Sequence, residues 1–198
     1  LFDKLTFPNS FSPESLWVHS VGVAVTSSSL ADYLHFSMSD QAYTCGLIHD
    51  IGKLAKLKYD QYKFCEELTK AHQSGLDNYQ TEIEQDSIRH DILGGLIAKS
   101  WGISKLVGSV AKWHHEEERS KRTDIDDPDA HKLIDIVQFS NSLINEMKFG
   151  NSGHGKKATP SARIMRRLQI SEDQLDEFEE KLKVELGREK EHLVLLSQ

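Results

Sequence analysis

The stretch Ala42–Leu54, AYTCGLIHDIGKL, decides how the rest of this chain is interpreted. Its apolar residues recur at helical spacing, and Ser39 followed by Asp40 precedes them as a helix N-cap, so we expect one buried helix across it. His49 and Asp50 lie side by side inside this helix. A buried carboxylate is costly unless it is paired or binds a metal. Taken alone, the pair is most simply a core histidine capped by an aspartate, and a pair of metal ligands is the alternative.

Three further residues of this stretch constrain its surroundings. Gly46 and Gly52 each cost roughly 1 kcal/mol of helix propensity relative to alanine. Glycines retained in a helix indicate that something packs or binds close to its backbone. Lys53 lies one turn beyond His49 and therefore shares its face.

The composition limits the classes of function. At 198 residues the chain is long enough for one well-buried domain with an appendage, and 38% hydrophobic with 28% charged residues is ordinary for a soluble protein. We expect no contact with a membrane. The net charge of −7 argues against binding of a nucleic-acid polymer but leaves room for a small phosphate ester held by a metal. Cys45 and Cys65 are expected to be free thiols in a reducing, cytoplasmic environment.

Helical spacing predicts helices throughout, and no stretch alternates as a strand, so we predict an all-α fold. An aromatic-rich helix is expected to end at Gly75, with Tyr59, Tyr62 and Phe64 packing inward. Thr81 and Glu84 would form the capping box of a later helix that ends at Gly102. The expected helices are Pro13 to about Leu34, Tyr59 to His72, Thr81 to Trp101, Ser104 to Trp113, and Leu133 to Met147.

The segments between and after these helices are polar. Residues 116–128 are predicted to form an exposed loop, with a lid as the alternative. Ser171 and Gln174 make a capping box before an amphipathic helix, which would dock on the main bundle or on a partner. We expect a helical domain at 1–150, a linker at 151–160 and a C-terminal helical extension at 161–198. A solvated face is the expected role of the basic cluster Lys156, Lys157, Arg163, Arg166 and Arg167.

Histidines stand at or beside the inner faces of four predicted helices. A single one is usually a satisfied core residue, but several buried imidazoles clustered without metal are hard to desolvate together. Convergence on metal is the simpler account. Imidazole with carboxylate suits Zn, Fe, Mn, Co or Ni, and five imidazoles would serve one ion or two ions bridged by Asp50. The residues are His19, His49 with Asp50, His90, and His114 with His115.

The order H…HD…H…HH, with HD inside HDIGK, resembles the HD superfamily of metal-dependent phosphohydrolases. Residues 11–148 most resemble the HDOD output domains of bacterial signalling proteins, through LWVHS, GLIHDIGKL and RHDILGGLIAKSWGI. This resemblance implies an HD-type helical bundle, here with an added C-terminal helix. Many HDOD domains have lost metal ligands and serve as signalling or scaffolding modules.

The ligand pattern resembles that of the HD-GYP branch, whose members hydrolyse cyclic di-GMP. The resemblance assigns metal ligation to His19, His49, Asp50, His90, His114 and His115, and contact with the substrate phosphate to Lys53. Asn141, aligned through VQFSNSL, stands where that branch has an aspartate, and EERSKRTDI replaces the GYP signature. Asn141 offers a carbonyl oxygen to a metal but no charge, and Asp135 is a poor substitute. Ser15 replaces an extra glutamate of some di-iron relatives, which disfavours a trinuclear site.

Two functions remain open from the sequence. The first is a metal-dependent phosphohydrolase that acts on a nucleotide, cyclic dinucleotide or other phosphate ester in bacterial signalling, with one or two divalent transition metal ions and with Asp50 and Lys53 as catalytic residues. The second is a catalytically inactive HDOD-type module that works through contacts with a signalling protein.

Overall fold

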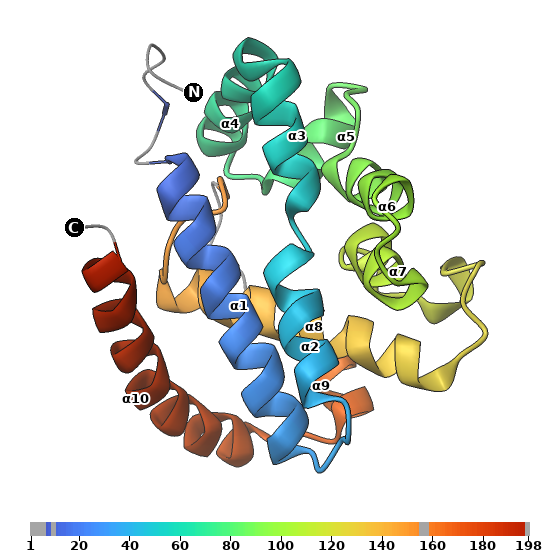
Figure 1. Ribbon diagram of the computed structural model, residues 1–198, viewed down its shortest axis with the longest axis vertical. Coiled ribbons are helices and arrows are strands. Elements are labelled where there is room, and N and C mark those ends of the chain that lie inside the picture. The colour runs from blue at the N-terminus through green and yellow to red at the C-terminus, as the bar shows by residue number, and fades with distance from the viewer. Residues whose placement is uncertain (1–6, 9–10, 155–158, 197–198) are drawn as a thin grey trace.

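The computed structural model describes the backbone of residues 7–8, 11–154 and 159–196 (Figure 1). All regular secondary structure in these residues is helical, which confirms the all-α prediction, and none of their helices is long and apolar enough to cross a membrane. The elements are α1 (Pro13–Tyr33), α2 (Ser39–Ile48), α3 (Ile51–Tyr59), α4 (Gln61–Ser74), α5 (Asn78–Glu84), α6 (His90–Ser100), α7 (Lys105–Trp113), the 3-10 turn η1 (Arg119–Lys121), α8 (Pro128–Met147), α9 (Ala162–Leu168) and α10 (Glu172–Leu196).

The main core lies between α1, α2 and α8. Leu30, Leu133 and Phe139 are fully excluded from solvent there, and each such side chain contributes about 1.5–3 kcal/mol by leaving water. Ser12 caps α1: it exchanges hydrogen bonds with Ser15 through both backbone N–H groups. Helix α7 adds Val107 and Val110 to this core, and α3, α4 and α5 lie towards the upper end of the molecule in Figure 1.

The prediction of one helix over Ala42–Leu54 is wrong. Helix α2 ends at Ile48 and α3 begins at Ile51, so His49 and Asp50 form the turn between them. Ser39 is the first residue of α2 and makes no side-chain cap. The break lets α3 turn towards α6, where a Cβ on Gly52 would meet the backbone of His90. The expectation of close packing at the two glycines is therefore confirmed, since Gly46 likewise lies against the backbone of α1.

The Thr81–Trp101 helix is also divided in two. The capping box belongs to Asp77 and Gln80, which start α5 one turn earlier, and the Thr81 hydroxyl bonds the Asp77 carbonyl instead. Helix α6 then starts at His90 and stops before Gly102, as predicted. Because the predicted helix is divided into α5 and α6, His90 is the first residue of α6.

Helix α4 ends at Gly75, which takes the left-handed conformation with φ 64° and confirms the predicted stop. Among the aromatic residues of this region, Phe64 is buried as expected. Tyr59 and Tyr62 are exposed by 87% and 74%, so the prediction that they pack inward is wrong.

The C-terminal helix docks on the main bundle. Its apolar stripe, Phe178, Leu182 and Leu186, is buried in the core, and Phe178 contacts the rings of Tyr33 and Phe139. The predicted capping box forms, since Ser171 and Gln174 exchange hydrogen bonds. In Figure 1, α10 runs along the outside of α1.

The 116–128 segment is more than an exposed loop. It contains η1, and Arg122 inside it is buried and donates to Glu116 O and to Asp135 Oδ1 at 2.8 Å. Asp135 also pairs with Arg119 and Arg167, so Arg167 does not belong to a solvated face. Arg163 and Arg166 are exposed as expected, and Lys156 and Lys157 lie outside the described residues. Helix α8 begins at Pro128, earlier than predicted, because Asp127 caps it.

Candidate metal centre

The six predicted His and Asp ligands come together in two overlapping groups. Asp50 with His90, His114 and His115 forms one group, and Asp50 with His19 and His49 forms the other. In each group the potential ligand atoms lie within 4.8 Å of one another. Four parts of the chain supply them: α1, the turn between α2 and α3, the start of α6, and the end of α7.

The two carboxylate oxygens of Asp50 face different histidines. Oδ1 lies 3.3 Å from Nε2 of His90 and 3.5 Å from Nε2 of His114. Oδ2 lies 3.3 Å from Nε2 of His49. His115 Nε2 is 3.0 Å from His90 Nε2 at the edge of the same group. A carboxylate placed between two sets of imidazoles in this way is suited to bridge two cations.

Hydrogen bonds at Nδ1 fix the orientation of three of these rings. His49 Nδ1 lies 2.7 Å from Gly46 O, and His114 Nδ1 lies 2.8 Å from Ala111 O. His90 Nδ1 lies 2.7 Å from Glu82 Oε2. Because these oxygens only accept hydrogen bonds, each Nδ1 carries the proton, which directs Nε2 towards Asp50. Metal-binding histidines usually donate their other ring N–H to a carboxylate or a backbone carbonyl in this way.

Several buried polar atoms of the site have no hydrogen-bond partner. They are Nε2 of His49 and His114, Oδ1 of Asp50, and both ring nitrogens of His19. A buried polar group without a partner costs about 1–3 kcal/mol. Coordination of a cation would satisfy these atoms, so the residues present fit a divalent metal.

The charge states also suit metal binding. Burial, with a contribution from His49, lowers the pKa of His19 to about 3. Burial also lowers the pKa of His114 and places that of His115 well below its usual value. These imidazoles are therefore neutral at pH 7, which is the form that ligates metal.

Two other groups of the site are held as ions. Burial acts to raise the Asp50 pKa. Interactions with Lys53 and His49 lower the pKa and outweigh burial, so the resulting pKa is well below the usual value. Burial acts to lower the His90 pKa, but Glu82 outweighs it and the resulting pKa is raised. A metal ion must therefore compete with a proton at His90 Nε2.

Lys53 is fully buried beside Asp50. Its ammonium donates to Asp50 Oδ2 at 2.7 Å and to the carbonyl oxygen of Ser152 at 3.0 Å. Contact with a substrate phosphate would require it to exchange the Ser152 carbonyl for a phosphate oxygen.

Asn141 borders the site from α8. It is 6% exposed, accepts a hydrogen bond from Asn145 at 2.9 Å, and is close enough to His19 to act on its pKa. Asp135 is held by three arginines instead. Ser15 is engaged in the cap of α1, where its hydroxyl donates to Ser12 O at 2.8 Å.

The segment Asn151–His154, at the start of the predicted linker, lies against the site. Its backbone is anchored where the Asn151 N–H donates to Ser15 O at 2.9 Å. Next to Ser152, Gly153 packs against Leu68 with φ 89°. His154 Nδ1 accepts from the Asn78 N–H at 3.5 Å, and burial lowers the His154 pKa well below its usual value.

Sequence reasoning missed three residues around the centre. Tyr79 stacks on His115 with ring centroids 4.4 Å apart and planes at 15°. Glu82 anchors His90, and His154 is near enough to Lys53 for the ammonium to affect its pKa. None of them stands at a distinctive spacing from a predicted ligand in the sequence. They lie in segments outside the helices that carry the histidines, and only the tertiary structure places them beside the centre.

Comparison with known proteins places the fold. A search of curated proteins found no match. An HDOD domain protein of unknown function from Geobacter sulfurreducens has 21% identity and a TM-score of 0.67 over 93% of this chain and 62% of that one. The MmoQ response regulator from Methylococcus capsulatus has 18% identity and a TM-score of 0.61 over 85% of this chain and 62% of that one.

At these identities the two structures support the fold alone, and the chain spans about three fifths of the length of each. The HDOD domain family matches residues 2–117, which is more than half of the sequence. With its HD-type histidine pattern and helical bundle, the chain belongs to the HDOD domain family.

Proposed function

We propose that this HDOD chain is a metal-dependent phosphohydrolase of HD type, acting on a nucleotide or another phosphate ester in bacterial signalling. The observation that carries the proposal is the position of Asp50. It is buried, ionised and shared by two groups of imidazoles, and Nε2 of His49 and His114 face it without a hydrogen-bond partner. So many buried polar atoms without hydrogen-bond partners would destabilise an apolar core unless a cation satisfied them.

Divalent ions bound there would polarise a phosphate oxygen and lower the pKa of a water molecule. Asp50 would hold the ions and orient that water, while the neutral His19, His114 and His115 would complete the ligand set. Lys53 would neutralise charge on the phosphoryl oxygens after releasing the Ser152 carbonyl. His115 is half-buried and marks the edge at which a substrate would enter.

Metal content and hydrolysis together test this proposal. Protein purified without chelator should contain about one to two equivalents of transition metal, as in other centres of this ligand type. It should also hydrolyse members of a panel of cyclic di-GMP, bis-p-nitrophenyl phosphate and p-nitrophenyl phosphate. His49→Ala should lose both properties, whereas His72→Ala, at an exposed histidine of α4, should keep both. Folded wild-type protein that binds no added Mn²⁺, Zn²⁺ or Co²⁺ would contradict the proposal.

The second candidate function is an inactive HDOD-type signalling module that works through protein contacts. Two observations favour it: Lys53 already neutralises Asp50, and large apolar side chains such as Ile88 and Trp101, each 68% exposed, lie outside the core. Wild-type protein that binds metal but turns over no phosphodiester would favour this module, with the metal in a structural role.

A further inference from the structure

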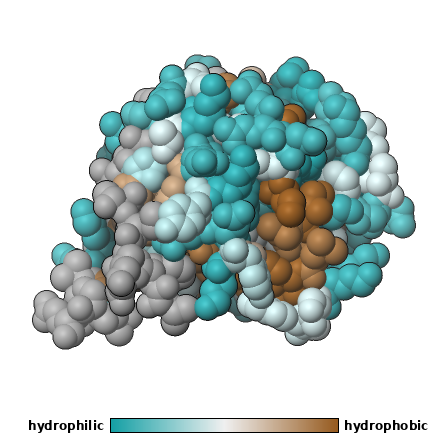
Figure 2. Space-filling model, turned by 90° about the horizontal axis from the view of Figure 1, so that it is seen from above, coloured by the Kyte–Doolittle hydropathy of each residue, from teal (hydrophilic) through white to brown (hydrophobic). Residues whose placement is uncertain are grey.

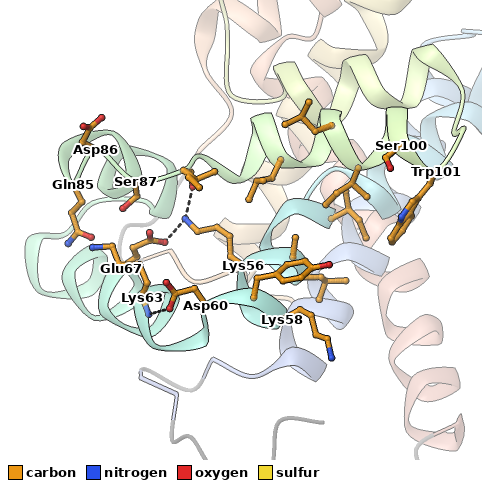
Figure 3. Close-up of a pocket in the computed structure, with 18 residues that line it drawn as sticks. Lys56, Lys58, Asp60, Lys63, Glu67, Gln85, Asp86, Ser87, Ser100 and Trp101 are labelled. Atoms are coloured by element: carbon orange, nitrogen blue, oxygen red, sulfur yellow. Dashed lines mark hydrogen bonds and ion pairs between the residues drawn. The ribbon is translucent and has the colours of Figure 1, made fainter.

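A groove lies beside α3, and its lining begins at Ile51, the residue after Asp50. It lies between α3, α4 and α6 and has a volume of about 1070 Å³ (Figure 3). Leu54, Leu96 and Trp101 give it an apolar lining, and Figure 2 shows apolar side chains gathered in one patch on the molecular surface. One charged side chain of the lining, Lys56, is almost wholly buried, with 8% exposed.

The ammonium of Lys56 is fixed by three partners. It lies 2.5 Å from Glu67 Oε2 and 2.6 Å from Glu82 Oε1, and it donates to the Ile88 carbonyl at 2.9 Å. Figure 3 shows the contact between Lys56 and Glu67 in the wall of the groove. Both glutamates are fully buried, and the positive charge of Lys56 offsets part of the cost of burying them.

Glu82 faces the metal centre with its other oxygen. Oε2 accepts from His90 Nδ1 at 2.7 Å and from the His90 backbone N–H at 3.1 Å. Glu82 thereby fixes the ring of His90 and satisfies one of the free N–H groups at the start of α6. One oxygen of Glu82 therefore pairs with Lys56 in the wall of the groove, and the other accepts hydrogen bonds from His90 in the metal centre.

Only a carboxylate can fill this position. It accepts on both oxygens, whereas an amide has one acceptor oxygen and one donor nitrogen. A glutamine would therefore turn its NH₂ either towards Lys56 or towards the N–H of His90, and one of these contacts would become a clash of donors.

We propose that Glu82 is a positioning residue of the metal centre, which holds His90 for coordination through Nε2 and is itself held by Lys56 in the wall of the groove. The proposal rests on the metal binding proposed above. It makes the Lys56–Glu82–His90 chain a direct physical connection between the groove and the ligand set.

Glu67 supplies the matched control. It is as buried as Glu82 and pairs with the same ammonium, but it makes no hydrogen bond to His90. Glu82→Gln and Glu67→Gln therefore remove the same charge from the same cluster, and only the first disturbs the metal ligand.

The test is a titration of wild type and both variants with Co²⁺, followed by its visible absorption, with folding checked by circular dichroism. Glu82→Gln should weaken Co²⁺ binding about 10–100-fold, as loss of the hydrogen-bond partner of a ligating histidine does, and should change the shape of the spectrum. Glu67→Gln should keep the wild-type spectrum and lose far less affinity. Equal losses in the two variants, or wild-type binding by folded Glu82→Gln, would overturn the proposal.

A measurement on the unmodified chain covers the case in which Glu82→Gln does not fold. Long-range ¹H–¹⁵N correlation spectra of the Zn²⁺-loaded protein report which nitrogen of each histidine holds the proton. His90 should keep its proton on Nδ1 and bind through Nε2, and binding through Nδ1 would refute the role of Glu82. Failure of wild type to bind Co²⁺ or Zn²⁺ at all is a separate result, which refutes the metal centre itself.

Discussion

The α-carbon of Gly52 faces the carbonyl oxygen of His90 so closely that a Cβ on Gly52 would stand 1.9 Å from that oxygen. Helices α3 and α6 therefore meet backbone to backbone beside the candidate centre. Gly52→Ala must push the start of α6 away and carry His90 with it. We expect a loss of about 1–3 kcal/mol or more in the free energy of unfolding, measured in urea, together with weaker Co²⁺ binding.

Gly187→Ala is the control for this substitution. Gly187 lies in α10, and a Cβ there would have nothing within 4 Å. The exchange should leave Co²⁺ binding unchanged and raise stability by up to about 1 kcal/mol through helix propensity. Wild-type stability in Gly52→Ala would show that α3 and α6 are not held as closely as described.

Lys53 gives a prediction about charge. Lys53→Met leaves Asp50 buried without its cation, so metal-free protein should lose about 3–5 kcal/mol of stability. Saturating Zn²⁺ should recover part of this loss, because a bound cation supplies the missing charge. If Zn²⁺ fails to bind the variant, Lys53 is required for the metal site itself, and its assignment to substrate phosphate is wrong.

The same pair predicts a dependence on pH in the metal-free protein. The Asp50 pKa in the folded state lies well below the ordinary value of 3.8. Such a group stabilises the fold fully above its unfolded pKa, and the contribution is lost as the pH falls through the folded pKa. The stability difference between wild type and Lys53→Met should therefore be largest near neutral pH and shrink as the pH falls, because Asp50 of the variant, buried without its cation, takes up a proton at a higher pH than Asp50 of wild type. Urea unfolding between pH 3 and pH 7 measures it, and a constant difference would contradict the pairing.

The two cysteines should differ in reactivity. Cys45 is 1% exposed, and burial raises its thiol pKa to about 12. Cys65 is partly exposed, and burial raises its pKa less severely. Because the thiolate is the reacting form, iodoacetamide should modify Cys65 of the native protein well before Cys45. Mass spectrometry of a time course checks the order, and equal rates after unfolding in urea are the internal control.

The histidine cluster could be predicted from sequence because each ligand candidate stands in or beside an apolar stripe. The turn at His49–Asp50 could not, because apolar spacing continues across it and neither residue is a helix breaker. Two consecutive pairs, Asp77 with Gln80 and Thr81 with Glu84, both fit a capping box. The packing that places His90 at the start of α6 decides between them, and this packing depends on residues far away in the sequence.

Residues that act through charge were harder to predict. Arg122 and Asp135 are buried together because the 116–128 segment folds back on α8. In the sequence this segment shows only high polarity, which is typical of an exposed loop. Glu82 is one of several glutamates before His90, and only the fold shows that it contacts the ring.

Asn141 is the position at which the two candidate functions diverge. It borders His19 and contributes a dipole, whereas a carboxylate would add a full negative charge beside a site that would carry +4 with two divalent ions. Asn141→Asp should therefore raise metal occupancy. If the rest of the centre is competent, it should also create or increase phosphodiesterase activity.

Gln138→Glu controls for the added charge. Gln138 is also buried on α8, but its side chain contacts Arg122 and the Trp113 carbonyl instead of the histidines. This variant should leave metal occupancy unchanged, as determined by elemental analysis after gel filtration. Unchanged occupancy and activity in Asn141→Asp would remove Asn141 from the ligand set. Asp135 could not take its place, because freeing that carboxylate would leave the guanidinium of Arg122 buried without its anion.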